Sequence, residues 1–179
     1  AAGRWQGELE HITRRPALPD DWMRTMFNAL VCQCLQMLAR TGSGEVWPRQ
    51  GGRYDGVWPV EAMEWLRALD RVGLGGWAHR GLRFWKDHQI SEGEDAGRFT
   101  GEASPLWTNQ TGGVLYALGY HLVVSGDRAA FDSWREPILS AVDWIERQRA
   151  LTKDGRSEPT PDDPQGWGLF PPGKGHDWE

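Results

Sequence analysis

Two carboxyl groups flank a tryptophan in the segment Asp177-Trp178-Glu179. An aromatic ring beside a carboxyl group excludes water, which raises the pKa of the carboxyl and keeps it protonated nearer to neutral pH. Cleavage of a glycosidic bond requires one protonated carboxyl, which releases the leaving oxygen, and a second carboxylate. Glu179 is therefore the candidate general acid, and Asp177 is a further candidate catalytic residue, with the second carboxylate of the pair left unassigned. A Glu179 that is simply solvated fits the same pattern.

Tryptophan is abundant in this chain, with 12 residues beside 3 Tyr and 5 Phe. Saccharide sites combine flat aromatic rings with polar side chains that bind hydroxyl groups. Several loops hold that combination, and their candidate saccharide-binding residues are Tyr54, Asp55, Trp58, Glu61, Trp107, Asn109, Gln110 and Trp178, with Trp167 as a further loop tryptophan. The tryptophans within helical patterns, namely Trp65, Trp77, Trp85, Trp134 and Trp144, are predicted to lie in the core.

Some of these residues have a second interpretation. Glu61 falls in the first turn of a predicted helix, where its charge would favour the helix dipole without binding a sugar. Asn109 could be an N-cap. The run 73–78 matches a dinucleotide fingerprint but follows a helix rather than a strand, and His176 with Asp177 and Glu179 lacks a distant fourth metal ligand. We predict no cofactor and no metal site.

Composition limits the class of protein. The 179 residues are 39% hydrophobic, which predicts one folded domain over 1–179. A net charge of -5 and a pI near 5.6 offer no broad positive field, so nucleic acid and membrane surfaces are not expected as partners. The most apolar stretch, 112–124, is too short to cross a bilayer. Cys32 and Cys34 stand two residues apart in a helical pattern and predict no disulfide framework.

Hydrophobic periodicity and Gly or Pro punctuation predict an all-α chain. An extended lead-in over 1–18 precedes the first predicted helix. Helices are expected from Asp20 or Asp21 to about Arg40, from Pro59 to about Val72, from just after a turn at Gly75 and Gly76 to about Gln89, from Asn109 to Val124, and then through Arg149 in a segment that Pro137 breaks or kinks. No strand alternation of useful length is present.

The loops that precede the helices recur. Trp58, Trp107 and Trp167 each stand in a long aromatic loop, 49 and then 60 residues apart, with a helix pair between them. Such a period predicts stacked helical hairpins. The helix over 109–124 is apolar nearly all round, whereas the one over 135–149 has a charged side, so the first is inner and the second outer. This predicts an (α/α) toroid whose tryptophan-bearing loops converge at one rim.

Two runs of residues resemble the six-hairpin glycosidases, with glucoamylase-like enzymes as the nearest comparison. The first is Tyr54-Asp55-Gly56-Val57-Trp58-Pro59-Val60-Glu61-Ala62 with the Leu-x-x-Leu-Asp-x-x-Gly run to Gly73, and the second begins at Trp107-Thr108-Asn109-Gln110-Thr111-Gly112 and includes 138–145. The resemblance implies that Trp58 and Glu61 open an inner helix at the sugar pocket. It also implies that Glu179 is the general acid of an inverting hydrolase. About half of an (α/α)6 barrel is covered, so the missing C-terminal half of the toroid or another domain is an expected partner.

Two other functions remain open. A polysaccharide lyase on a similar toroid would need a Tyr or His near the sugar acid and a basic residue, for which Arg53, Tyr54 and His176 are available. A non-catalytic carbohydrate-binding module would keep the scaffold without a carboxylate pair. The principal expectation is a glycoside hydrolase acting on an oligo- or polysaccharide.

Overall fold

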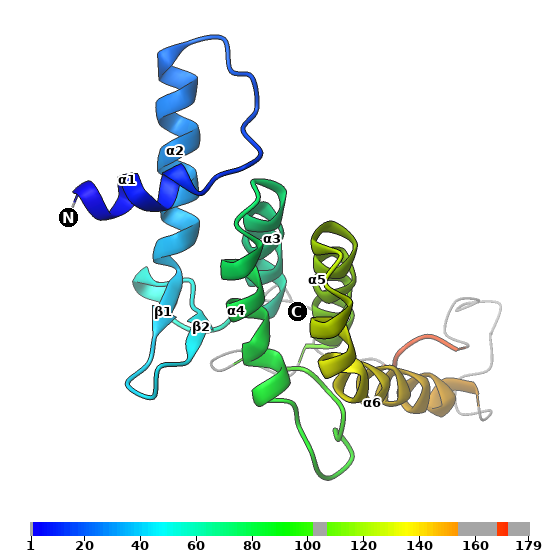
Figure 1. Ribbon diagram of the computed structural model, residues 1–179. Helices are drawn as coiled ribbons and strands as arrows, with labels where there is room; N and C mark the ends of the chain where they lie inside the picture. Colours follow the sequence, from blue (N-terminus) through cyan, green and yellow to red (C-terminus); the bar gives the residue numbers. More distant parts are fainter. Residues whose placement is uncertain (1, 102–106, 154–167, 172–179) are drawn as a thin grey trace, which may run out of the picture.

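The structure, a computed structural model, describes residues 2–101, 107–153 and 168–171 of the chain. In these ranges the protein is all-α apart from one small sheet (Figure 1). The elements in chain order are α1 (Ala2–Glu10), α2 (Asp21–Gln36), β1 (Leu38–Arg40), β2 (Val46–Pro48), a 3-10 turn (Gly52–Tyr54), α3 (Pro59–Arg71), α4 (Gly75–Asp87), α5 (Gln110–Ser125) and α6 (Arg128–Lys153). The all-α class that the periodicity predicts is confirmed.

Helices α3 and α5 lie side by side and run in the same direction. Near their starts, the ring centroids of Trp58 and Trp107 are 5.6 Å apart. Near their ends, His121 Nδ1 lies 2.8 Å from Asp70 Oδ1. Helix α4 follows α3 after a short turn, so it runs antiparallel to both and packs against them (Figure 1). These three helices form the body of the protein.

The core lies between these helices. Its apolar side chains recur at three-and-four spacing and include Ala62, Leu66 and Leu69 of α3, Ala78, Leu82 and Trp85 of α4, and Val114, Ala117 and Leu118 of α5. Burying each leucine contributes about 1.5–3 kcal/mol. Gly81 permits the close approach of α4 to α3, because a Cβ there would lie 2.6 Å from Leu66 Cδ2. Trp65, Trp85, Trp134 and Trp144 are buried as predicted, and Trp77 is partly buried.

The first segment of the chain corrects the expectation of an extended lead-in over 1–18. Residues Ala2–Glu10 form helix α1, and only the chain after it is extended. Trp5 and Leu9, four residues apart on one face of α1, pack against the core, and Ile12 is buried just after the helix ends. Trp77 Nε1 also donates a hydrogen bond to Glu8 Oε2 at 3.0 Å, which ties α1 to α4.

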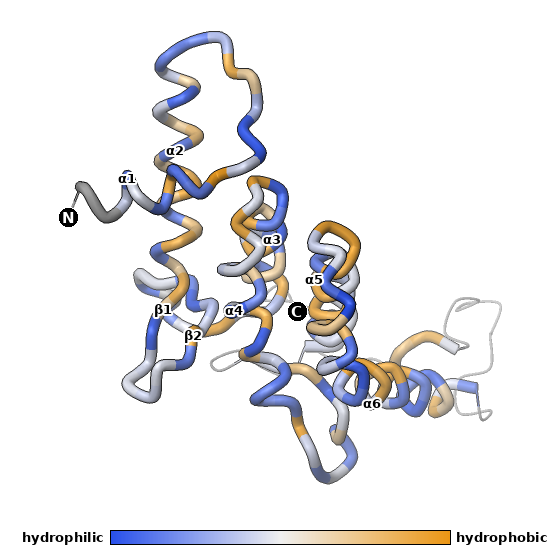
Figure 2. The backbone as a smooth tube through the Cα atoms, in the orientation of Figure 1, coloured by the Kyte–Doolittle hydropathy of each residue, from blue (hydrophilic) through white to orange (hydrophobic). Residues whose placement is uncertain are grey.

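Helix α2 ends at Gln36, four residues before the predicted end at Arg40. The chain turns instead into the antiparallel pair β1–β2, in which Ala39 lies opposite Trp47. Leu38, the first residue of β1, is buried in the core, and this burial favours the strand over a continued helix. Along α2, hydrophobic and hydrophilic segments alternate, and its first half extends beyond the rest of the helical body (Figure 2).

Helix α6 contains Pro137 and continues through it to Lys153. Gln89 Nε2, from the loop after α4, donates hydrogen bonds to the carbonyl oxygens of Gly97 at 2.7 Å and Pro137 at 2.9 Å. Helix α6 lies at a steep angle to α5 (Figure 1). No helix in the described part of the chain is long and apolar enough to cross a membrane.

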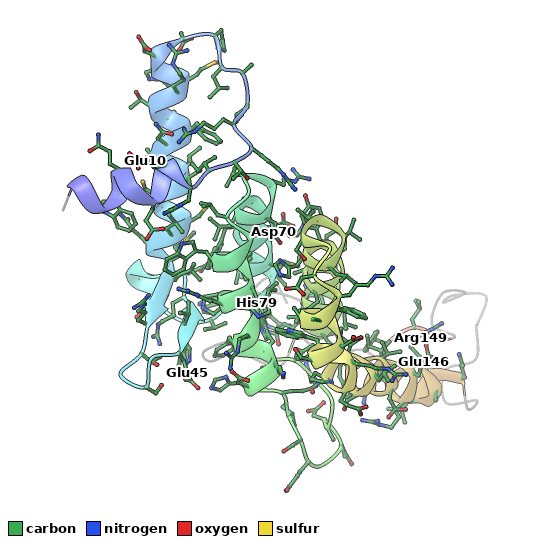
Figure 3. All side chains as sticks on the ribbon, in the orientation of Figure 1. Glu10, Glu45, Asp70, His79, Glu146 and Arg149 are labelled. Carbon is green, nitrogen blue, oxygen red and sulfur yellow. The ribbon has the colours of Figure 1, made fainter. Side chains whose placement is uncertain are left out.

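A buried polar cluster joins the ends of α3 and α5 to the start of α4. Asp70 is buried and contacts His121 at 2.8 Å, and the ring of His79 lies 5.6 Å from the ring of His121 (Figure 3 labels Asp70 and His79). Burial, reinforced by electrostatic interactions with His121 and Arg83, lowers the pKa of His79 from its usual 6.5.

Protonation of His79 should therefore couple stability to pH. As the pH falls below 6.5, the unfolded chain binds a proton that folded His79 resists, so the free energy of unfolding decreases. In urea unfolding at about pH 7.5 and about pH 5.5, the His79→Gln variant should lose less stability on acidification than the wild-type protein. The exposed His11→Gln variant is the control and should keep the wild-type pH dependence. Equal pH dependence in the His79 variant and the wild type would contradict this assignment.

Candidate functional site

The candidate site lies where α3 and α5 begin. Because the two helices are parallel neighbours, the loops that enter them arrive at the same end of the body. Trp58 directly precedes α3 and Trp107 stands just before α5, and their rings meet at 5.6 Å with an interplanar angle of 41°. Two of the three predicted tryptophan loops thus come together.

The two rings differ in exposure. Trp107 is 2% exposed and belongs to the interior, whereas Trp58 is partly exposed. Trp107 therefore cannot offer an open face to a ligand in this structure. The ring of Trp107 packs against the ring of Trp58. Trp58 is the one of the two rings that solvent or a ligand can reach.

Each ring is held by the local backbone. Pro59 occupies the first position of α3, where its missing N–H removes no helical hydrogen bond, and Ala62 N donates to Trp58 O at 2.8 Å. The carbonyl oxygen of Trp107 accepts a hydrogen bond from Arg98 Nη2 at 2.9 Å. Arg98 is 7% exposed and stacks over the ring of Trp144 of α6 at 5.0 Å. Sequence reasoning missed this role of Arg98, because a single Arg in a polar loop carries no signal of burial.

The loop between α4 and α5 is attached to both neighbouring helices. Thr111 Oγ1 of α5 accepts a hydrogen bond from Phe99 N at 3.1 Å. Trp144 Nε1 of α6 donates to Asp95 Oδ1 at 3.2 Å, and Asp95 also pairs with Arg98 at 3.2 Å. Trp107 is therefore placed by a connected set of buried contacts rather than by a free loop.

Glu61 lies in the first turn of α3, three residues after Trp58, and is partly buried. Its Oε2 atom is buried and accepts no hydrogen bond from any residue that the structure describes. A buried acceptor without a donor costs about 1–3 kcal/mol. Glu61 therefore adds to the start of α3 a carboxylate oxygen with unused hydrogen-bonding capacity.

The other predicted residues have different environments. Asn109 is exposed and occupies the N-cap position of α5, but its side chain makes no capping hydrogen bond. Gln110 is 0% exposed, so its side chain is closed to a ligand in this structure. Asp55 is exposed and forms a bidentate ion pair with Arg49, at 2.9 and 3.1 Å. The hydrogen bonds from Arg49 lower the pKa of Asp55, which keeps it ionised.

Several predicted residues cannot be placed. Asp177, Trp178 and Glu179, as well as Trp167 and His176, lie outside the described residues, and for Tyr54 only the backbone is described. The candidate catalytic carboxylates therefore stay sequence predictions. Within 2–101, 107–153 and 168–171, no three His, Cys, Asp or Glu side chains come together as a metal site would require.

A second concave region was not predicted from the sequence. It has a volume of about 520 Å³ and lies between the β1–β2 turn and the second half of α4. Its residues come from segments about 40 positions apart, so no local motif marks it.

This chain matches no known protein family, no curated protein and no solved structure. The resemblance to six-hairpin glycosidases thus rests on the sequence motifs alone.

Gly97 tests how tightly the loop that carries Trp107 is held. Gly97 and Gly93 both have positive φ, at 93° and 78°, where an added Cβ costs about 1–2 kcal/mol. A Cβ at Gly97 would also lie 2.2 Å from the backbone oxygen of Ser140 in α6, whereas nothing lies within 4 Å of one at Gly93. Gly97→Ala should lower the free energy of unfolding by about 3 kcal/mol and Gly93→Ala by about 1 kcal/mol, measured by urea unfolding. Similar losses in both variants would show that this loop is not fixed against α6.

Proposed function

We propose that this chain binds saccharide where α3 and α5 begin and that it acts as a glycoside hydrolase on oligo- or polysaccharides. The observation that carries the proposal is the contact of the partly exposed Trp58 with the buried Trp107. Glu61 follows Trp58 by three residues. This combination of a supported aromatic platform and a nearby acceptor suits a pyranose ring, which has an apolar face and a rim of hydroxyl groups.

The contacts suggest a role for each residue. Trp58 would take the apolar face of the sugar, and Trp107 would hold the Trp58 ring in place so that little side-chain freedom is lost on binding. Glu61 would accept a hydrogen bond from a sugar hydroxyl after its side chain turns Oε2, which is buried in this structure, toward the ligand. Asn109 is exposed at the start of α5, and its side-chain amide would both donate hydrogen bonds to the sugar and accept them from it.

The arrangement of helices supports a toroidal architecture as part of this proposal. In an (α/α) toroid, parallel inner helices stand next to each other and antiparallel outer helices connect them. The parallel pair α3 and α5, with α4 antiparallel between them in sequence, corresponds to two inner helices and one outer helix. We propose hydrolysis with inversion, in which Glu179 is the general acid and Asp177 a further catalytic carboxylate.

Removing the platform should weaken saccharide binding. We expect Trp58→Ala to lower the affinity for neutral gluco-oligosaccharides about tenfold or more, because the stacking contact is lost. Isothermal titration calorimetry measures this. Trp22→Ala is the matched control, because Trp22 is 67% exposed in α2 and belongs to another part of the protein. Equal affinity of the Trp58 variant and the wild type for every oligosaccharide that binds would overturn the proposed site.

The hydrolytic step has its own test. A positioned general acid contributes about 100-fold or more to the rate, so Glu179→Gln in the full-length protein should reduce the release of reducing ends at least by that factor. Oligosaccharide binding in that variant should stay within about threefold of wild type, because Trp58 and Glu61 are unchanged. Unchanged turnover would overturn the role of Glu179. Binding that depends on Trp58, without turnover of any glycan in the wild type, would replace the hydrolase by a non-catalytic binding module.

A further inference from the structure

We propose that the cavity between the β1–β2 turn and α4 is a second binding site, specific for an anionic sugar that carries a carboxylate or a phosphate. The cavity has a volume of about 520 Å³, within the range of small-molecule sites. On one side it is lined by residues 40 and 43–47, and on the other by residues of α4 and the following His88. Glu45, labelled in Figure 3, lies on the side of the β1–β2 turn.

Arginines outnumber carboxylates in the lining. Arginines reach the cavity from two elements, Arg40 from β1 and Arg80 and Arg83 from α4, against the two carboxylates Glu45 and Asp87. Both carboxylates are already engaged. Glu45 Oε2 accepts a hydrogen bond from Trp47 Nε1 at 3.0 Å, and Asp87 pairs with Arg83 at 3.6 Å.

Two guanidinium groups are left for a ligand. Arg80 lies over the ring of Trp77 at 4.7 Å, and neither Arg40 nor Arg80 forms an ion pair with a residue that the structure describes. Guanidinium groups bind carboxylate and phosphate oxygens with paired hydrogen bonds. In a chain whose net charge is -5, a cavity with this local excess of arginine is a selective place for an anion.

An aromatic cluster forms another part of the wall. Phe84 and His88 stack with their centroids 4.4 Å apart, and Trp47 meets both edge-on at 5.3 and 5.2 Å. These rings support one another and give the cavity a rigid apolar surface beside the arginines. A ligand that has both a flat apolar face and an anionic group fits this lining better than an isolated anion, and an acidic or phosphorylated pyranose has both features.

This second site is at the same end of the helical body as Trp58 and Trp107. Helix α4 runs antiparallel to α3, so its second half, which lines the cavity, lies toward the start of α3. The choice of a sugar as the ligand rests on the proposed function, whereas the anion-binding part of the inference stands without it.

Calorimetric titration with D-glucuronate and with glucose 6-phosphate tests the site, with glucose and inorganic phosphate as reference probes. At least one of the two anionic sugars should bind, and glucose should bind at least about tenfold more weakly. Arg40→Gln and Arg80→Gln should each weaken that binding about tenfold, since each removes charge-assisted hydrogen bonds. Added NaCl should weaken it further. Whichever of the two sugars binds identifies carboxylate or phosphate as the preferred group.

Arg135→Gln is the matched control, because Arg135 is an exposed arginine of α6 outside the cavity. Arg40 and Arg80 are also exposed, so their variants should keep the wild-type unfolding midpoint. The proposal would be overturned if neither anionic sugar binds. It would also be overturned if Arg135→Gln weakens binding as much as Arg40→Gln does. Inorganic phosphate that binds as tightly as glucose 6-phosphate would overturn its sugar part. Trp58→Ala should leave this binding unchanged, so failure of the site at α3 and α5 is distinguishable from failure here.

Discussion

The parallel contact between α3 and α5 is the constraint on which the other features depend. Asp70 and His121 meet in the interior near the ends of the two helices, and removing either would leave a buried polar group without its partner. A slip of one helical turn would shift α5 along α3 by about 5.4 Å and separate the pair. The same register brings Trp58 and Trp107 together at the opposite end. One interior hydrogen bond and one aromatic contact thus hold the same alignment from both ends.

The loop between α4 and α5 shows how a long connection becomes part of a rigid site. Arg98 contacts the carbonyl oxygen of Trp107, the carboxylate of Asp95 and the ring of Trp144. Gln89 and Thr111 attach the same loop to α6 and α5. Since Arg98 and Thr111 are buried polar residues that find hydrogen-bond partners in these contacts, the loop and the helices stabilise one another. A binding surface built on such a loop loses little conformational entropy when a ligand arrives.

Charge is distributed unevenly over this acidic chain. At the start of α3 the carboxylate of Glu61 accompanies the tryptophans, whereas the cavity beside α4 is rich in arginine. The two regions share one end of the helical body. Both regions contain aromatic rings, Trp58 and Trp107 in the first and Trp47, Phe84 and His88 in the second. The sign of the charge beside these rings differs between the two regions.

The sequence by itself determined the class of the fold and the approximate limits of α3 and α5, because helical periodicity, Pro59 and the glycines at 73 and 126 act through neighbours in the chain, whereas α4 begins at Gly75, inside the turn that the sequence predicts. It also indicated that Trp58 and Trp107 belong to one end. Tertiary structure alone decided the rest. The burial of Trp107 and Gln110, the strand at Leu38, the contacts of Arg98, and the lining of one cavity by both Arg40 and Arg80 depend on segments distant in sequence. Their packing energies override local propensity, and no spacing along the chain encodes which side of a ring will face solvent.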